Sequence, residues 1–234
     1  MQLGEDTTTM SMTLNPVNEA AFQKAVQSLE TLNRAAVFHP TGTGKSCIAW
    51  KVVEAHPQTT FFWLVAGAQR LALRQAELTR YNGGTLPGNV RFCDCEKLAA
   101  ATPEQWVRLG EQKPGCIVLD CYHELSAVCW AQSVQKLLRM CPQAKVLGLG
   151  VPNGAPVCAA AQELFADCIV SHMTVAEAMA AGTMPVPSAY AALLWPQEEE
   201  LATLRARIKN LCMPKGDTSL RVPHGAYGIV VDVK

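Results

Sequence analysis

A short apolar run, AAVFH at residues 35–39, leads directly into the sequence HPTGTGKS at residues 39–46. The two glycines, Gly42 and Gly44, allow the backbone to turn tightly and to point successive N–H groups inward at an oxyanion. A helical pattern follows at residues 45–54, so the amino end of that helix adds partial positive charge at the same place. An apolar strand, a glycine-rich loop ending in Gly-Lys-Ser and a helix are the context in which a phosphate-binding loop works. The sequence therefore predicts a phosphate site in this loop.

Within the loop, two side chains have separate expected roles toward a triphosphate. Lys45 would reach the β- and γ-phosphates, and the hydroxyl of Ser46 would serve a Mg²⁺ ion. The other candidate ligands are the remaining loop residues: Pro40, Thr41, Gly42, Thr43 and Gly44. The first position, which is glycine in the usual form of this motif, is His39 here. The alternative interpretation is a glycine-rich turn that binds nothing.

Beyond this loop the chain alternates short apolar runs with helical stretches of about ten residues. Strand-like runs lie at residues 35–39, 59–66, 90–94, 116–120, 145–150 and 168–172. Helical patterns lie at residues 17–32, 45–54, 69–80, 103–110, 130–140, 157–165 and 174–181. Such alternation is typical of βαβ units. We therefore expect an α/β fold: a three-layer sandwich of a mostly parallel sheet with helices on both faces.

The α/β pattern ends at residues 182–187 (GTMPVP), where prolines remove backbone donors and favour extended conformations. We expect three parts: a flexible segment at 1–13, the α/β domain at 14–187 and an appendage at 188–234. In the appendage, residues 198–211 alternate acidic and basic side chains around apolar ones, which predicts a solvated helix. Residues 215–234 support no firm assignment.

Composition excludes several classes of protein. The chain has 234 residues, of which 49% are hydrophobic and 17% charged, with 20 basic and 20 acidic residues. This balance argues against disorder and against a strongly basic nucleic-acid module. The longest charge-free stretch, residues 178–197, is broken by prolines, and the first residues lack the features of a signal peptide. We therefore expect no membrane partner and a cytoplasmic protein.

The ten cysteines lack the spacing of a metal site. No C-x-x-C pair is present, and the closest pair is Cys93-x-Cys95. The others are scattered through apolar segments, where a free cysteine behaves as a small buried hydrophobe. We expect reduced core thiols; a zinc site is the alternative.

A phosphate loop that serves Mg²⁺ needs a second acidic residue at the end of a neighbouring strand. The run CIVLD at residues 116–120 ends in Asp120, the best candidate in the chain. Its carboxylate would hold the metal opposite Ser46. We therefore predict Ser46 and Asp120 as the metal-binding residues, and Lys45 and Asp120 as members of the catalytic set.

Taken together, these residues resemble the first RecA-like domain of superfamily-two helicases of the DEAD/DEAH-box type, in a degenerate and truncated form. HPTGTGKS corresponds to motif I, residues 64–75 (LVAGAQRLALRQ) resemble motif Ia, and residues 120–123 (DCYH) occupy motif II. The resemblance extends from about residue 14 to residue 187. It implies ATP and Mg²⁺ as cofactors.

The resemblance also implies roles for residues outside the phosphate loop. Asn18 stands where an adenine-reading residue is found, and His123 would relay between ATP and a second domain; a core histidine is the alternative for His123. Arg70 and Arg74 would contact the phosphates of a DNA or RNA backbone. The alternative for both arginines is the solvated face of a helix.

Three departures from the family pattern bear on mechanism. Cys121 replaces the glutamate that orients the attacking water, and loss of a general base costs ~10²–10⁴ in rate. Residues 150–152 (GVP) replace the Ser-Ala-Thr of motif III. Residues 188–234 are too few for a second RecA-like domain, which would carry an arginine finger. We expect a helicase-type domain that binds ATP-Mg²⁺, hydrolyses it weakly and does not unwind a duplex alone.

Two other functions remain open from the residues. In one, ATP only stabilises a regulatory module whose helix at 198–211 docks a protein partner. In the other, the loop serves a small-molecule kinase, although no arginine-rich lid is visible. If the chain is a helicase-type domain, the expected partners are ATP, a weakly bound DNA or RNA backbone, and a separate protein that supplies the second lobe.

Overall fold

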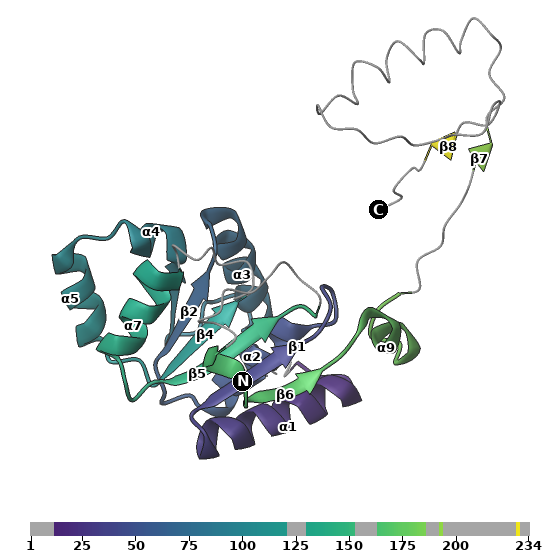
Figure 1. Ribbon diagram of the computed structural model, residues 1–234, viewed down its shortest axis with the longest axis horizontal. Helices are drawn as coiled ribbons and strands as arrows, with labels where there is room; N and C mark the ends of the chain where they lie inside the picture. The colour runs from purple at the N-terminus through teal and green to yellow at the C-terminus, as the bar shows by residue number, and fades with distance from the viewer. Residues whose placement is uncertain (1–11, 121–129, 153–162, 186–191, 194–227, 230–234) are drawn as a thin grey trace, which may run out of the picture. The chain divides into compact units, whose positions relative to one another are not determined.

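The computed structural model describes residues 12–120, 130–152 and 163–185, together with two short strands at 192–193 and 228–229 (Figure 1). The chain divides into two compact units, Met1–Pro185 and Val186–Lys234. In the second unit, β7 (Ala192–Leu193) pairs antiparallel with β8 (Gly228–Ile229). The predicted helix at 198–211 lies outside the described residues, as does most of the one predicted at 157–165. The predicted domain limits at 14–187 stay a prediction.

A six-stranded sheet forms the centre of the first unit, and every neighbouring pair in it is parallel. Its strand order is β3-β2-β4-β5-β1-β6. The strands are β1 (Arg34–Phe38), β2 (Phe61–Val65), β3 (Val90–Asp94), β4 (Cys116–Asp120), β5 (Lys145–Gly150) and β6 (Ile169–His172). The predicted α/β class with a parallel sheet is confirmed.

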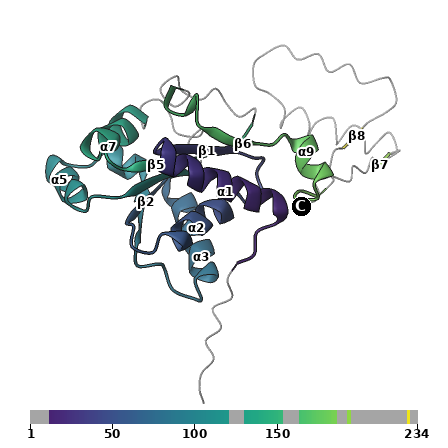
Figure 2. The same ribbon diagram turned by 90° about the horizontal axis from the view of Figure 1, so that it is seen from below.

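Helices cover both faces of this sheet (Figure 2). The helices on one face are α1 (Pro16–Thr31), α2 (Lys45–Ala55) and α3 (Ala68–Tyr81). Those on the other are α4 (Cys95–Ala99), α5 (Pro103–Glu111) and α7 (Gln135–Met140), which continues a π-helical turn at Trp130–Val134. The last helix, α9 (Val175–Ala180), follows β6.

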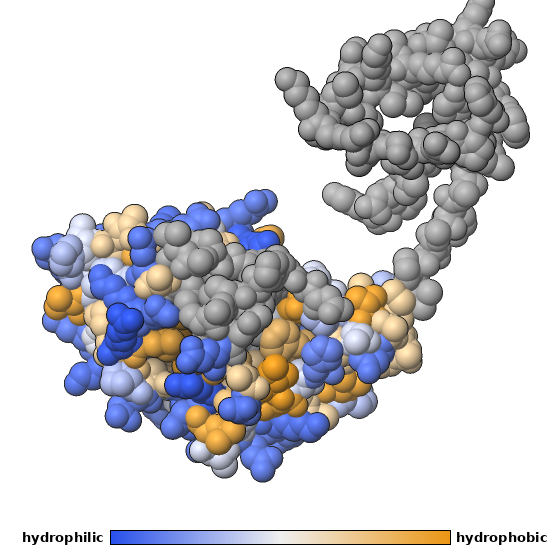
Figure 3. Space-filling model, viewed as in Figure 1, coloured by the Kyte–Doolittle hydropathy of each residue, from blue (hydrophilic) through white to orange (hydrophobic). Residues whose placement is uncertain are grey.

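Alternation along the strands fills both layers of the core. In β2, Phe61 and Trp63 pack in the layer of α1, α2 and α3, whereas Phe62 and Leu64 pack in the opposite layer. All five residues of β2 are buried, as expected for a strand covered on both faces. β6 is an edge strand of the sheet. Apolar residues are exposed on the side of β6 and α9 (Figure 3). Ile169 in β6 and Val175 in α9 are among the exposed large apolar residues.

The register brings the two predicted functional segments to one edge of the sheet. Phe38 at the end of β1 pairs with Gly150, and the neighbouring Leu149 pairs with Asp120 at the end of β4. Because all strands run in the same direction, the loop after β1 and the carboxylate ending β4 share the carboxyl edge, where ligands bind in open α/β sheets.

The cysteines fit the prediction of core thiols. Six lie in the described residues as thiols outside any disulfide, and four of them are buried. Burial raises the pKa of Cys93 and of Cys116 to about 12, so these thiols stay protonated at neutral pH. Within the described residues no cluster of three or more His, Cys, Asp or Glu side chains could hold a metal. No helix in that part of the chain is long and apolar enough to cross a membrane.

Gly148 in β5 is required by packing. A Cβ atom at this position would lie 2.6 Å from Cζ of Phe165, which is 1% exposed. We predict that Gly148→Ala lowers the free energy of unfolding by about 1–3 kcal/mol, because the buried ring has to shift. Urea unfolding measures this, with Gly88→Ala as control, because nothing lies within 4 Å of a Cβ at Gly88. Equal stabilities of the two variants would contradict the prediction.

Candidate phosphate-binding site

The loop between β1 and α2 is closed by its own side chains. Gly42 and Gly44 adopt φ values of 87° and 88°, a left-handed conformation that favours glycine. The hydroxyl of Thr43 donates to the carbonyl oxygen of Pro40 at 2.8 Å. The ammonium of Lys45 donates to the carbonyl oxygens of His39 and Pro40 at 2.8 and 2.9 Å. The loop is therefore held in a curved conformation by the lysine that was predicted to bind phosphate.

Asn18 supports this loop from α1. Its amide nitrogen donates to the carbonyl oxygen of Thr43 at 2.8 Å, and the side chain is buried. A Cβ atom at Gly44 would lie 2.9 Å from the same nitrogen, so the close approach requires glycine. Asn18 does not line the pocket described next, and in this geometry it positions the loop. Its predicted contact with adenine stays a prediction.

A cavity of about 500 Å³ opens over the loop. Its lining residues come from the loop and the start of α2, from β2, from α3 and from the end of β4: Thr41, Gly42, Gly44, Lys45, Ser46, Cys47, Val65, Arg70, Leu73, Arg74, Glu77, Tyr81 and Asp120. Three of these side chains are cations and two are carboxylates. The predicted residues Arg70 and Arg74 thus line the same pocket as Lys45 and Ser46.

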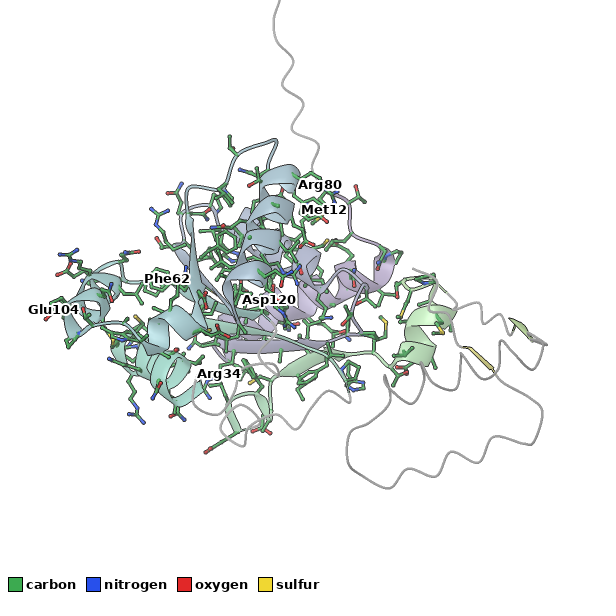
Figure 4. The ribbon with its side chains drawn as sticks, turned by 90° about the horizontal axis from the view of Figure 1, so that it is seen from above. Met12, Arg34, Phe62, Arg80, Glu104 and Asp120 are labelled. Carbon is green, nitrogen blue, oxygen red and sulfur yellow. The ribbon has the colours of Figure 1, made fainter. Side chains whose placement is uncertain are left out.

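Asp120 already accepts hydrogen bonds from protein side chains inside this pocket. It is 2% exposed and lies beside α3, whereas Arg80, farther along that helix, is exposed (Figure 4). One carboxylate oxygen, Oδ2, accepts hydrogen bonds from the indole of Trp63 at 3.1 Å and from Nε of Arg74 at 2.5 Å. The other, Oδ1, accepts from a terminal nitrogen of Arg74 at 3.4 Å. A guanidinium therefore covers both oxygens of the predicted metal ligand.

Arg74 is held from both sides. Its second terminal nitrogen donates to Glu77 one turn along α3, and its side chain is 24% exposed. Burial alone would lower the pKa of Arg74, but the charge of Asp120 and the hydrogen bonds to Asp120 and Glu77 outweigh it and raise that pKa. Arg74 is thus a fixed positive charge in the pocket, and its predicted contact with nucleic acid stays a prediction.

The arrangement suits an anion better than it suits a divalent cation. Left-handed glycines, the first turn of α2 and Lys45 supply backbone N–H groups and positive charge to a phosphate. Ser46 and Asp120, the predicted Mg²⁺ ligands, both line the pocket, but Asp120 presents its oxygens to a guanidinium. The residues fit a polyphosphate, and in this arrangement they do not offer an open carboxylate to a metal.

Sequence reasoning did not single out several members of the site, among them Trp63, Glu77 and Tyr81. The indole of Trp63 donates to Asp120, and Glu77 and Tyr81 line the pocket. For Glu77, the spacing of three residues from Arg74 was a usable signal. His123 and Cys121 lie outside the described residues, so their predicted roles stay predictions.

No family model and no curated protein matches the chain. Among solved structures, the DEAH/RHA helicase HrpB of Escherichia coli is similar, with a TM-score of 0.52 and 18% identity over 89% of this chain and 33% of that one. A DUF1998 helicase, MrfA, gives a TM-score of 0.49 and 13% identity over 86% of this chain and 41% of that one. The chain therefore spans less than half the length of either. The similarity to HrpB shows the α/β RecA-like fold, as predicted.

His39, at the first position of the loop, makes stability depend on pH. Burial, the nearby charge of Lys45 and His172 lower its pKa from 6.5 to about 4. Between these values the unfolded chain binds more protons than the native one. The stability contributed by the neutral imidazole is therefore fully present above pH 6.5 and is lost as the pH falls to about 4.

We predict that His39→Gln removes part of this pH dependence. On acidification from pH 7 to 4.5, the wild type should lose about 2–3 kcal/mol more of its free energy of unfolding than the variant does. Urea unfolding at both pH values measures the difference. Identical pH dependence in the two proteins would show that His39 is not buried in its neutral form.

Proposed function

We propose that this chain is a helicase-type ATP-binding domain that holds the triphosphate of ATP over the loop between β1 and α2. The observation that carries the proposal is Lys45, which lies at the start of α2, lines the cavity and is hydrogen-bonded to two loop carbonyls. A triphosphate offers oxygens to the same ammonium and to the backbone N–H groups of the loop. The residues that approach the phosphates are Thr41, Gly42, Gly44 and Ser46.

We infer that hydrolysis by this chain is weak. The residue after Asp120 is a cysteine, which does not deprotonate water as a glutamate does at neutral pH. Arg74 forms an ion pair with Asp120 in the pocket, so the carboxylate is not available to hold a metal or to orient an attacking water. A second lobe, from a separate protein or from chain beyond this sequence, would raise the rate by supplying an arginine finger.

Nucleic-acid binding is the weaker part of the proposal. Arg70 and Arg74 line the cavity. The phosphates of ATP and those of a DNA or RNA backbone would therefore compete for the same two arginines. We infer that any contact with nucleic acid is sequence-independent and weak at physiological salt, because few phosphates are neutralised. The chain alone does not unwind a duplex.

The alternative function is an interaction module that ATP stabilises without turnover. This alternative is favoured because Asp120 is already hydrogen-bonded to Arg74. Steady-state ATP hydrolysis, measured with and without single-stranded DNA or RNA, separates the two functions. Turnover that nucleic acid stimulates supports the helicase-type ATPase. Tight ATP binding without turnover supports the module.

We predict that Lys45→Ala weakens ATP binding by roughly 100-fold, because the phosphates lose a charged donor of a kind worth several kcal/mol of affinity. Calorimetric titration measures the dissociation constant, with thermal unfolding to confirm that the variant is folded. The matched control is Lys24→Ala on the exposed face of α1, which should bind as the wild type does. Unchanged affinity in folded Lys45→Ala would remove the assignment of the phosphate site.

A further inference from the structure

The ion pair between Arg74 and Asp120 occupies the place that a divalent metal would need. Two elements far apart in the sequence, α3 and the end of β4, meet there, and Trp63 fixes the carboxylate from a third. Oδ2 receives two donors and Oδ1 receives a third. A metal ion entering between Ser46 and Asp120 would therefore have to displace a charge-assisted hydrogen bond.

A divalent cation also faces electrostatic opposition in this pocket. The guanidinium lies within hydrogen-bond distance of both oxygens of Asp120, so a metal on that carboxylate would stand beside a fixed positive charge. Mg²⁺ demands near-octahedral oxygen ligands and gives up water reluctantly. A carboxylate that is 2% exposed and already bound to an indole and a guanidinium is a poor ligand for it.

In other nucleotide-binding sites a divalent metal supplies positive charge to the polyphosphate. Arg74 can supply positive charge here instead. Asp120 and Glu77 take one N–H from each of its three nitrogens, and each terminal nitrogen carries a second N–H. Arg74 lines the same cavity as Lys45. A planar guanidinium matches the geometry of phosphate oxygens.

The setting of Arg74 differs from that of an ordinary helix-surface arginine. Arg80, on the same helix, is exposed, and its guanidinium lies 5.2 Å from the centre of the Tyr81 ring. Arg74 instead forms ion pairs with two carboxylates, one of them buried. Those partners hold its charge in the pocket, which the solvated-face interpretation does not require.

We propose that Arg74 takes the place of the divalent metal, so that this chain binds the triphosphate of ATP without Mg²⁺. The inference rests on the proposed function, because it concerns the ligand of the same pocket. Lys45 and the loop hold the phosphates, and Arg74 donates its remaining terminal N–H groups to them. Asp120 and Glu77 are positioning residues that keep the guanidinium in place.

The test is calorimetric titration of ATP into the full chain, once with Mg²⁺ and once with excess EDTA. We expect the wild-type dissociation constants in the two conditions to agree within about threefold. Binding that requires Mg²⁺ would overturn the inference and leave the proposed function standing. Failure to bind ATP in either condition would overturn the proposed function, and the inference with it.

The variant Arg74→Met tests whether Arg74 is responsible for ATP binding without Mg²⁺. Arg74→Met should bind ATP at least ~10-fold more weakly in EDTA, and Mg²⁺ should restore the affinity because Asp120 becomes free to hold it. The matched control is Arg108→Met on the exposed face of α5, which should bind as the wild type does in both conditions. Wild-type affinity of Arg74→Met in EDTA would overturn the inference.

A second variant guards against misfolding, because Arg74→Met leaves Asp120 buried without its cation. In the double variant R74M/D120N neither charge remains, and circular dichroism and thermal unfolding verify its fold. We expect it to bind weakly in EDTA and to gain nothing from Mg²⁺, since the carboxylate is gone. Wild-type affinity of the double variant in EDTA would contradict the role of Arg74.

Discussion

Parallel pairing of β1 with β5, and of β5 with β4, is the constraint on which the site depends. Residues far apart in the sequence reach one edge only because these three strands end in register. Gly148 sits at the middle of that arrangement, paired with Ala36 on one side and Leu119 on the other. Its missing side chain leaves room for Phe165, so the core beneath the site is filled without distorting the sheet.

The charged side chains that line the pocket nearly balance one another. Three cations, Lys45, Arg70 and Arg74, and two carboxylates, Glu77 and Asp120, line one cavity, so that only a modest positive excess remains for a ligand. An anion gains from this excess directly, whereas a divalent cation must first break the pair between Arg74 and Asp120. The same pair would therefore favour the proposed phosphate ligand and limit the proposed hydrolysis.

The strand, glycine-rich loop and helix at residues 34–55 were predictable because the information for them is local. Glycines, lysine and serine follow a strand and precede a helix within a dozen residues, and each has one physical role. The parallel sheet was equally predictable, because buried strands separated by helices have few other arrangements. The parallel α/β sheet that those patterns predicted is present, and its fold is the RecA-like one that the resemblance implied.

The partner of Arg74 was not predictable in the same way. As a helix position, Arg74 is equally compatible with solvent, nucleic acid or a buried carboxylate, and only the packing of α3 against the end of β4 decides between them. Trp63 illustrates the same limit, because a tryptophan in an apolar run signals core and says nothing of its indole N–H. The role of Asn18 in supporting Thr43 likewise depends on how α1 lies against the loop.

Whether a triphosphate lies between Lys45 and Arg74 is the central question. A crystal structure of the chain with a non-hydrolysable ATP analogue, grown in EDTA, answers it most directly. We predict phosphate oxygens within hydrogen-bond distance of the Lys45 ammonium, of the backbone N–H groups of the loop and of the Arg74 guanidinium. Phosphates bound elsewhere, or a pocket that takes up the analogue only when Mg²⁺ separates Arg74 from Asp120, would contradict that prediction.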